Sequence, residues 1–279
     1  MNRSAKQIFF ISNTSNKKIH LGKCRLDDIF PHLLVSSSNA TIEMTDDVTT
    51  AVSMLVRLLE SFTNHLVVIN NGIPIGVVGS TEILKGFFKN PKTSFFNNIV
   101  KNMMSNDLCI VNKKTKLANL LKKMQKYEID FAILQNEKGV FSTISTRRLL
   151  ELGILCDTDI KISQIQKKNI FFCTNDETIR SAIYTMLTNH TNVLVIKNTP
   201  FIITGRVILE KIQNELKYNH EIDNFLDYKI KDLDPYEATI TNNNLSIPDM
   251  CNLMLKMKHP YIMTSNQVFT PYDLVTVLS

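Results

Sequence analysis

The stretch Val268-Phe269-Thr270-Pro271-Tyr272-Asp273-Leu274 decides the fold of this 279-residue chain. Val268 and Phe269 are typical of a strand, and Thr270 is typical of the residue that caps the start of a helix. The stretch therefore predicts a strand that delivers a hydroxyl and, three residues later, a carboxylate onto the first turn of a helix. Free N–H groups at a helix start attract anions, so this turn is a candidate binding site for a polar anionic ligand.

The same stretch also has a purely structural interpretation. Thr-x-x-Asp is a capping motif, in which the two side chains satisfy N–H groups at the start of a helix. The pattern alone leaves both interpretations of Thr270 and Asp273 open.

The residues before this stretch complete a compact α/β unit. Ala238-Thr239-Ile240 predicts an extended segment, residues 246–257 predict a helix, and Pro260-Tyr261-Ile262-Met263 predicts a strand that pairs with Val268-Phe269. The order is thus strand, helix, two strands and helix.

This order occurs three more times toward the N-terminus. The predicted caps of the first helices are Asp47, Thr115, Thr178 and Ser246. The matching positions in the closing helices are Glu82, Arg148, Val207 and Asp273. The first and third copies are offset by 131 residues at the caps (47 to 178), and so are the second and fourth (115 to 246). Such regular internal repetition indicates a duplicated duplication.

The repeat resembles the CBS domain, whose closing pattern is roughly glycine, two hydrophobic residues, Thr or Ser, two variable residues, Asp and a hydrophobic residue. Val100-Lys101-Asn102-Met103-Met104, ahead of the second copy, is similar to the lead-in of that family. The resemblance covers residues 30–278. It implies an α/β fold with four CBS-type βαββα units arranged as two pseudo-twofold tandem pairs, called Bateman modules.

The resemblance also implies domain boundaries. An N-terminal extension at residues 1–29 precedes a first pair at 30–157 and a second pair at 158–279. The expected units lie at about 30–90, 98–154, 160–216 and 226–279.

In that family the clefts commonly hold adenine nucleotides or relatives such as S-adenosylmethionine. The Thr or Ser contacts phosphate, and the Asp holds ribose hydroxyls, which fits a carboxylate as an acceptor of two hydroxyl donors. Only the fourth copy keeps both groups, Thr270 and Asp273, with Tyr272 between them. The resemblance therefore places the better site in the C-terminal pair. The partner copy is expected to supply the adenine side, largely through backbone, from Ile170, Phe171, His190 and Thr191.

The other copies depart from the pattern. Thr204 is kept, but Val207 removes the ribose acceptor. Ser145 is followed by Arg148, which could pair with phosphate but cannot accept a ribose hydroxyl. In the first copy the hydroxyl is missing at the matching position, although Ser80 or Thr81 could substitute for it, and Glu82 is one methylene longer than Asp. These departures leave open whether the N-terminal pair binds a ligand.

Composition and charge narrow the function classes. A hydrophobic content of 44% and a charged content of 21% are typical of a soluble globular protein. No apolar run reaches the ~20 residues of a membrane span, and no secretory signal is recognisable. The five scattered cysteines and six isolated histidines predict neither disulfides nor a metal site, so we expect the cytoplasm. No nucleophile or phosphate-loop motif is present, so we expect a protein that is not an enzyme.

The expected function is regulatory ligand sensing, with AMP, ADP, ATP or an S-adenosylmethionine-like molecule as regulatory ligand and no cofactor. A separate effector protein would receive the signal, and we expect a homodimer. One alternative is a scaffold module with degenerate sites. Another is a nucleic-acid-associated regulator, because the net charge is +6 and basic residues cluster with only Asp107 as a counter-charge. The cluster comprises Lys101, Lys113, Lys114, Lys116, Lys122, Lys123 and Lys126.

Overall fold

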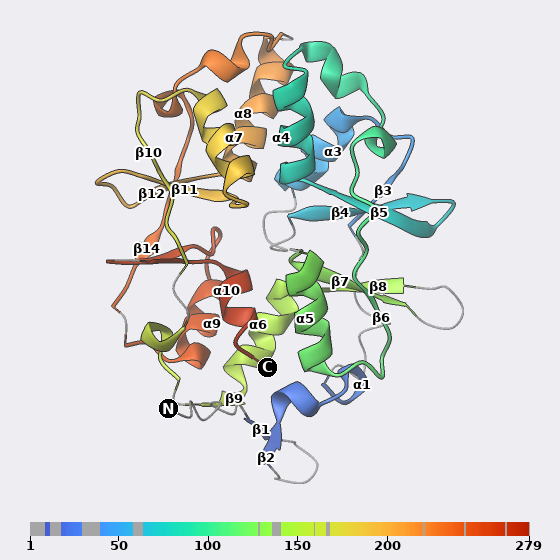
Figure 1. Cartoon of the computed structure of the whole chain (residues 1–279), viewed down its shortest axis with the longest axis vertical. Coiled ribbons are helices and arrows are strands. Elements are labelled where there is room, and N and C mark those ends of the chain that lie inside the picture. The colour runs from blue at the N-terminus through green and yellow to red at the C-terminus, as the bar shows by residue number, and fades with distance from the viewer. Residues whose placement is uncertain are drawn as a thin grey trace. The chain divides into compact units, whose positions relative to one another are not determined.

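A computed structural model describes most of the chain (Figure 1). The described residues are 9–11, 18–29, 40–57, 64–127, 129–135, 141–158, 160–165, 168–219, 221–242, 244–265 and 267–278. Among the described helices, none combines the length and apolar character needed to cross a membrane.

Four repeats with the predicted order of elements make up most of the fold. The first comprises β3 (Thr41–Glu43), α3 (Val48–Arg57), β4 (His65–Asn70), β5 (Ile73–Gly79) and α4 (Ser80–Lys89). The second comprises β6 (Ile110–Val111), α5 (Leu117–Tyr127), β7 (Phe131–Gln135), β8 (Phe141–Ser145) and α6 (Thr146–Ile154). The third comprises β10 (Phe172–Cys173), α7 (Ile179–Thr188), β11 (Val193–Ile196), β12 (Phe201–Thr204) and α8 (Gly205–Tyr218). The fourth comprises β14 (Thr239–Ile240), α9 (Ile247–Leu255), β15 (Ile262–Thr264), β16 (Gln267–Phe269) and α10 (Pro271–Val275).

Each repeat forms one small sheet of the same topology. In the first three repeats the first strand pairs in parallel with the second, and in all four the second pairs antiparallel with the third. A parallel pair needs a crossover connection, which the first helix of each repeat provides. In the third repeat β13 (Tyr236–Glu237) adds a fourth strand beside β12.

The described remainder consists of short elements between and before the repeats. The strands β1 (Phe9–Ile11), β2 (Lys18–His20) and β9 (Cys156–Asp157) form a further antiparallel sheet. The short helices are α1 (Leu26–Ile29), η1 (Leu21–Lys23), η3 (Thr93–Asn97), η4 (Val100–Asn102), η5 (Ile162–Gln164), η6 (Phe225–Asp227) and η7 (Ile230–Asp232).

The closing helices begin where the sequence predicts. Their N-caps are Gly79, Ser145, Thr204 and Thr270, so the four matching positions all lie at the third residue of the helix. Among the first helices, the predicted cap at Thr115 is wrong by one residue, since α5 begins at Leu117. The Thr115 hydroxyl instead accepts a hydrogen bond of 3.2 Å from the Asn112 N–H, which builds a turn ahead of the helix.

The repeats combine into two compact units. The first and third repeats form what we call the odd unit, residues 40–107 and 169–239. The second and fourth repeats form the even unit, which contains the described parts of residues 1–39, 108–168 and 240–279. Each predicted tandem pair therefore contributes one repeat to each unit, and the pair boundaries at 30–157 and 158–279 stay a prediction.

Helices hold each unit together (Figure 1). In the odd unit α3 packs against α8, and α4 packs against both α7 and α8. In the even unit α6 packs against α9 and α10. The core of each unit therefore lies between the helices of two repeats that are far apart in sequence.

The segment ahead of the first strand of each repeat, which we call the lead-in, bonds to the turn that precedes the first helix of another repeat. In the even unit the lead-in of repeat one bonds to repeat two, where the Leu26 N–H donates to the Thr115 carbonyl at 3.0 Å. The lead-in of repeat three bonds to repeat four, where the Ile162 N–H donates to the Leu245 carbonyl at 3.0 Å.

The odd unit contains the reverse exchange. The lead-in of repeat two bonds to repeat one, where the Val100 N–H donates to the Asp46 carbonyl at 2.8 Å. The lead-in of repeat four bonds to repeat three, where the Ile230 N–H donates to the Glu177 carbonyl at 2.9 Å. Repeats one and two thus exchange lead-ins, as do repeats three and four.

All five cysteines are buried thiols. Burial raises the pKa of the Cys109 thiol to about 11 from an ordinary 9.0, with Lys123 opposing the shift slightly. Burial raises the pKa of Cys156 to about 12, and burial together with the neighbouring Cys156 raises the pKa of Cys251 to about 12. The thiols are therefore uncharged and shielded in the folded chain.

We expect the five thiols to be unreactive toward Ellman's reagent at about pH 8 and to react fully in denaturant. The raised thiol pKa values also make the free energy of unfolding depend on pH. Their stabilising contribution is complete below the unfolded pKa of 9.0 and is lost as the pH rises toward 11 and 12. Urea melts between about pH 7 and pH 11 should show this alkaline loss. Rapid modification of the native protein would contradict the assignment.

Candidate functional site

The predicted pair at α10 forms a capping box. The Asp273 Oδ2 atom accepts hydrogen bonds of 2.8 Å from both the Thr270 N–H and the Thr270 hydroxyl. The Asp273 side chain is 6% exposed, so this carboxylate is almost completely removed from solvent. Thr270 and Asp273 therefore form the capping motif in this structure. A ligand at this place would have to bond to polar atoms that the capping box does not use.

The other carboxylate oxygen is what remains. Asp273 Oδ1 forms an ion pair with the ammonium group of Lys168, but it accepts no well-directed hydrogen bond from any described residue. The same ammonium lies 5.4 Å from the centroid of the Tyr272 ring, within the range of a cation–π contact. One cluster in the even unit thus contains Lys168, Thr270, Tyr272 and Asp273.

Sequence reasoning missed Lys168. It lies 105 residues before Asp273 in the chain, in the segment between η5 and β10. The only local signal was the doublet Lys167-Lys168, one residue ahead of the apolar residues Ile170 and Phe171 that lead into β10. A basic pair at that place does not itself indicate which carboxylate it faces.

The predicted adenine-side residues belong to the odd unit. The Phe171 carbonyl accepts a hydrogen bond of 2.9 Å from the Val195 N–H, and the Thr191 hydroxyl donates to the Val193 carbonyl at 3.1 Å. His190 has a left-handed backbone with φ of 49°, and Ile170 lies just ahead of β10. Because these residues and Asp273 lie in different units, their common role stays a prediction.

The candidate residues of the first two repeats make contacts within their own helices. The Glu82 Oε2 atom accepts a hydrogen bond of 2.8 Å from the Gly79 N–H and so caps α4. Arg148 pairs with Glu151 on the same helix at 2.9 Å, while Ser145 caps α6 without a side-chain hydrogen bond. These contacts are those of ordinary capped helices, and none of them favours ligand binding at these residues.

In the third repeat the start of α8 is occupied by protein groups. Thr204 is fully buried, and its hydroxyl oxygen accepts from the Val207 N–H at 3.3 Å. The Gly205 N–H donates to Asn192 Oδ1 at 3.1 Å, and a Cβ atom on Gly205 would lie 2.7 Å from the Ser80 hydroxyl oxygen. The starts of α4 and α8 therefore approach closely, and the Gly205 and Val207 N–H groups at this helix start already donate to protein oxygens.

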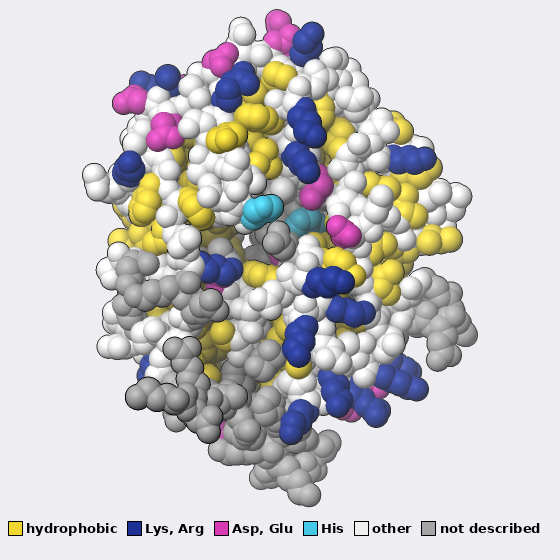
Figure 2. All heavy atoms as spheres, viewed as in Figure 1, with side chains coloured by type: hydrophobic (Ala, Val, Ile, Leu, Met, Phe, Trp, Pro, Cys, Tyr) yellow, Lys and Arg dark blue, Asp and Glu magenta, His cyan; other side chains and the backbone are white. Residues whose placement is uncertain are grey.

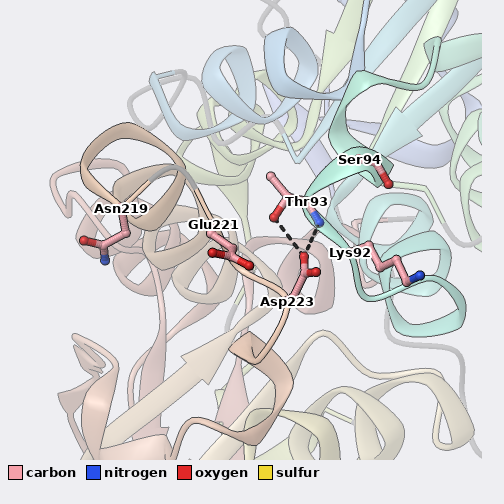
Figure 3. A pocket seen from close by; sticks show the side chains of 6 residues that line it. All are labelled: Lys92, Thr93, Ser94, Asn219, Glu221 and Asp223. Atoms are coloured by element: carbon pink, nitrogen blue, oxygen red, sulfur yellow. Dashed lines mark hydrogen bonds between the residues drawn. The ribbon is translucent and has the colours of Figure 1, made fainter.

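An open hollow of about 440 Å³ lies on the odd unit (Figure 3). Its lining residues are Lys92, Thr93, Ser94, Asn219, Glu221 and Asp223. The Thr93 N–H and hydroxyl both donate to Asp223 Oδ1, at 2.8 and 2.9 Å, as the dashed lines show. These bonds hold the pKa of the Asp223 carboxyl below its usual value, with the Thr93 N–H contributing most. The contact joins the segments that follow α4 and α8, so its role is structural.

The lysines of the predicted basic cluster are exposed. Six of them lie in the even unit on α5 and the chain ahead of it, and Lys101 lies in the odd unit. Figure 2 shows a concentration of Lys and Arg side chains over the part of this face where α5 runs. The Lys123 ammonium donates to the Ile110 carbonyl at 3.0 Å, and the Lys126 ammonium lies 5.2 Å from the Tyr127 ring centroid. Among the described residues, no group of three potential metal ligands is present.

Comparisons with known proteins address the fold. No family model and no curated protein matches the sequence. A solved structure from Methanocaldococcus jannaschii, named as a candidate archaeal homologue of γ-AMPK, matches with a TM-score of 0.75 and 13% identity. That match covers 92% of this chain and 100% of the other. An uncharacterised conserved protein from Pyrococcus horikoshii matches with a TM-score of 0.55 and 11% identity, over 88% of this chain and 98% of the other.

A CBS domain-containing protein from Bacillus anthracis is 20% identical over 47% of this chain and 94% of its own. Its TM-score is 0.37, so the fold assignment does not depend on it. The predicted α/β class with four βαββα repeats is confirmed. The likeness over almost the whole chain shows that this chain has the fold of the M. jannaschii structure, built here from four βαββα repeats of the kind that the resemblance to CBS domains implies.

Proposed function

We propose that this chain is a regulatory module that binds an adenine nucleotide or a related adenosyl ligand and signals to a separate protein. Its best site is the cluster at Thr270, Tyr272 and Asp273. The observation that carries the proposal is the Asp273 carboxylate, which is almost fully buried and keeps Oδ1 without a well-directed hydrogen bond. The two hydroxyls of a ribose are hydrogen-bond donors, and such an oxygen can accept hydrogen bonds from them.

One further observation supports a regulatory module, and another distinguishes the repeats from one another. The whole-chain likeness to the candidate γ-AMPK homologue favours a regulatory role. The third repeat, in contrast, fills the start of α8 with Asn192 and Ser80, so the repeats are unequal in their capacity to bind. A ligand would act by its differential affinity for two arrangements of the chain, since equal affinity would shift neither. A homodimer and a cytoplasmic location stay predictions.

The test is a thermal-shift panel with AMP, ADP, ATP, S-adenosylmethionine and NAD. We expect at least one adenosyl ligand to stabilise the chain by about 2.7 kcal/mol at 100 times its dissociation constant. Asp273→Ala should abolish this shift, because it removes the ribose acceptor.

Asp249→Ala is the matched control. Asp249 occupies the same third position in α9, and its N–H donates to the Ser246 hydroxyl oxygen at 3.2 Å, but the carboxylate is exposed. The control therefore loses a helix-start acid without losing the proposed site, and its ligand shift should persist. No shift with any ligand, or a shift that persists in Asp273→Ala, would overturn the proposal.

A second candidate is favoured by the exposed lysines on and ahead of α5. Such a surface can bind a polyanion such as a nucleic acid through phosphate contacts. Its affinity would fall steeply with salt concentration, whereas a scaffold surface of mixed contacts would be far less sensitive.

A further inference from the structure

We propose that Lys168 makes the Asp273 site selective for phosphorylated adenylates over adenosine and over adenosyl ligands with a net positive charge. The inference rests on the proposed function and narrows its ligand class. It assigns to Lys168 the role of a specificity residue, which the pattern of the repeats does not indicate.

The two charges of the pair have different environments. The Asp273 side chain is 6% exposed, whereas the Lys168 side chain is 59% exposed. The carboxylate is held by the capping box at Oδ2, and α10 fixes its position. The ammonium instead sits at the end of a flexible stem, beside the Tyr272 ring. Lys168 can therefore move, and Asp273 cannot.

A ribose that bonds to Asp273 Oδ1 has to take the place of the ammonium. Ribose hydroxyls are good donors but carry no charge, so the exchange separates a buried carboxylate from its counter-charge. Separating such a pair is unfavourable, because a buried charge left alone is strongly destabilising. Binding of adenosine would therefore carry the full free-energy cost of separating the pair.

A phosphorylated ligand compensates for the exchange. Its phosphate provides a new negative partner for the released ammonium, and charge-assisted contacts of this kind are stronger than neutral hydrogen bonds. S-adenosylmethionine has the opposite character, since its sulfonium and ammonium groups outweigh its carboxylate and would repel Lys168. The pair therefore favours AMP, ADP or ATP over both other kinds of ligand.

The experiment is isothermal titration calorimetry of the full chain with AMP and with adenosine. We expect the unmodified chain to bind AMP about tenfold more tightly than adenosine, as a charge-assisted contact provides. In Lys168→Met this preference should be lost, with AMP weakened and adenosine equal or tighter. Lys168→Arg should retain the preference, because it keeps the positive charge.

Lys122→Met serves as the matched control, since it removes one exposed lysine of the same unit from the outer face of α5. The preference of this control for AMP over adenosine should equal that of the unmodified chain. Thermal melts would verify that every variant folds. An unchanged preference in Lys168→Met would overturn this inference and leave the proposed function intact. Failure of the unmodified chain to bind either compound would overturn the proposed function itself, and the inference with it.

Discussion

Phe87→Ala should lower the free energy of unfolding by about 3–5 kcal/mol, as expected for loss of a large aromatic side chain from a packed core. Phe87 is fully buried near the end of α4. Its ring centroid lies 5.2 Å from that of Phe96, 5.9 Å from that of Phe95 and 6.0 Å from that of Phe225. The side chain thus joins α4 to the lead-ins of repeats two and four within the odd unit, and its removal would open a cavity among them.

Urea unfolding followed by circular dichroism measures this change. Phe88→Ala is the matched control, since Phe88 is only half-buried and its ring lies 6.5 Å from that of Tyr184. We expect a clearly smaller loss for the control, within the range of an ordinary partly exposed site. Equal losses at the two positions would contradict the assignment of Phe87 to the core.

Gly153→Ala should destabilise the chain by about 1–3 kcal/mol through overpacking. A glycine inside a helix is usually improved by alanine, by about 1 kcal/mol. Here the added Cβ would lie 2.4 Å from the Cys251 sulfur, because Gly153 of α6 lies against Cys251 of α9. The steric cost should therefore exceed the gain in helix propensity.

The explanation predicts coupling between the two positions. In a Cys251→Ala background the obstructing sulfur is absent, so Gly153→Ala should become neutral or stabilising. A double-mutant cycle in urea would measure this interaction free energy, which separate sites do not show. If Gly153→Ala stabilised the unmodified chain, the close packing of α6 on α9 would be refuted.

Local features of the fold could be predicted from the sequence because their causes are local. The caps at Thr204 and Thr270 and the apolar runs between them contain the information that starts and ends each element. The cap at Thr115 was wrong because Asn112 competes for the same hydroxyl and builds a turn. Such competition depends on backbone geometry that side-chain type does not reveal.

The pairing of helices and the contents of the site depend on residues far apart in the chain. Phe87 meets Phe225, and Lys168 meets Asp273, across more than a hundred residues in each case. Apolar helix faces of similar composition can pack against several partners, so periodicity indicates that a face is buried without indicating against what. The ligand pattern likewise identified Asp273 but not the cation that faces it.

The exchange of lead-ins bears on how such a chain could have grown. A single repeat copied with its own lead-in would carry a segment whose binding place is on another repeat, and its own first helix would lack the backbone partner that another lead-in supplies. Two neighbouring repeats copied together bring both halves of the exchange. The duplicated piece in this architecture is therefore two repeats long, which agrees with the equal offset of 125 residues between the matching closing-helix positions of copies two apart (82 to 207 and 148 to 273).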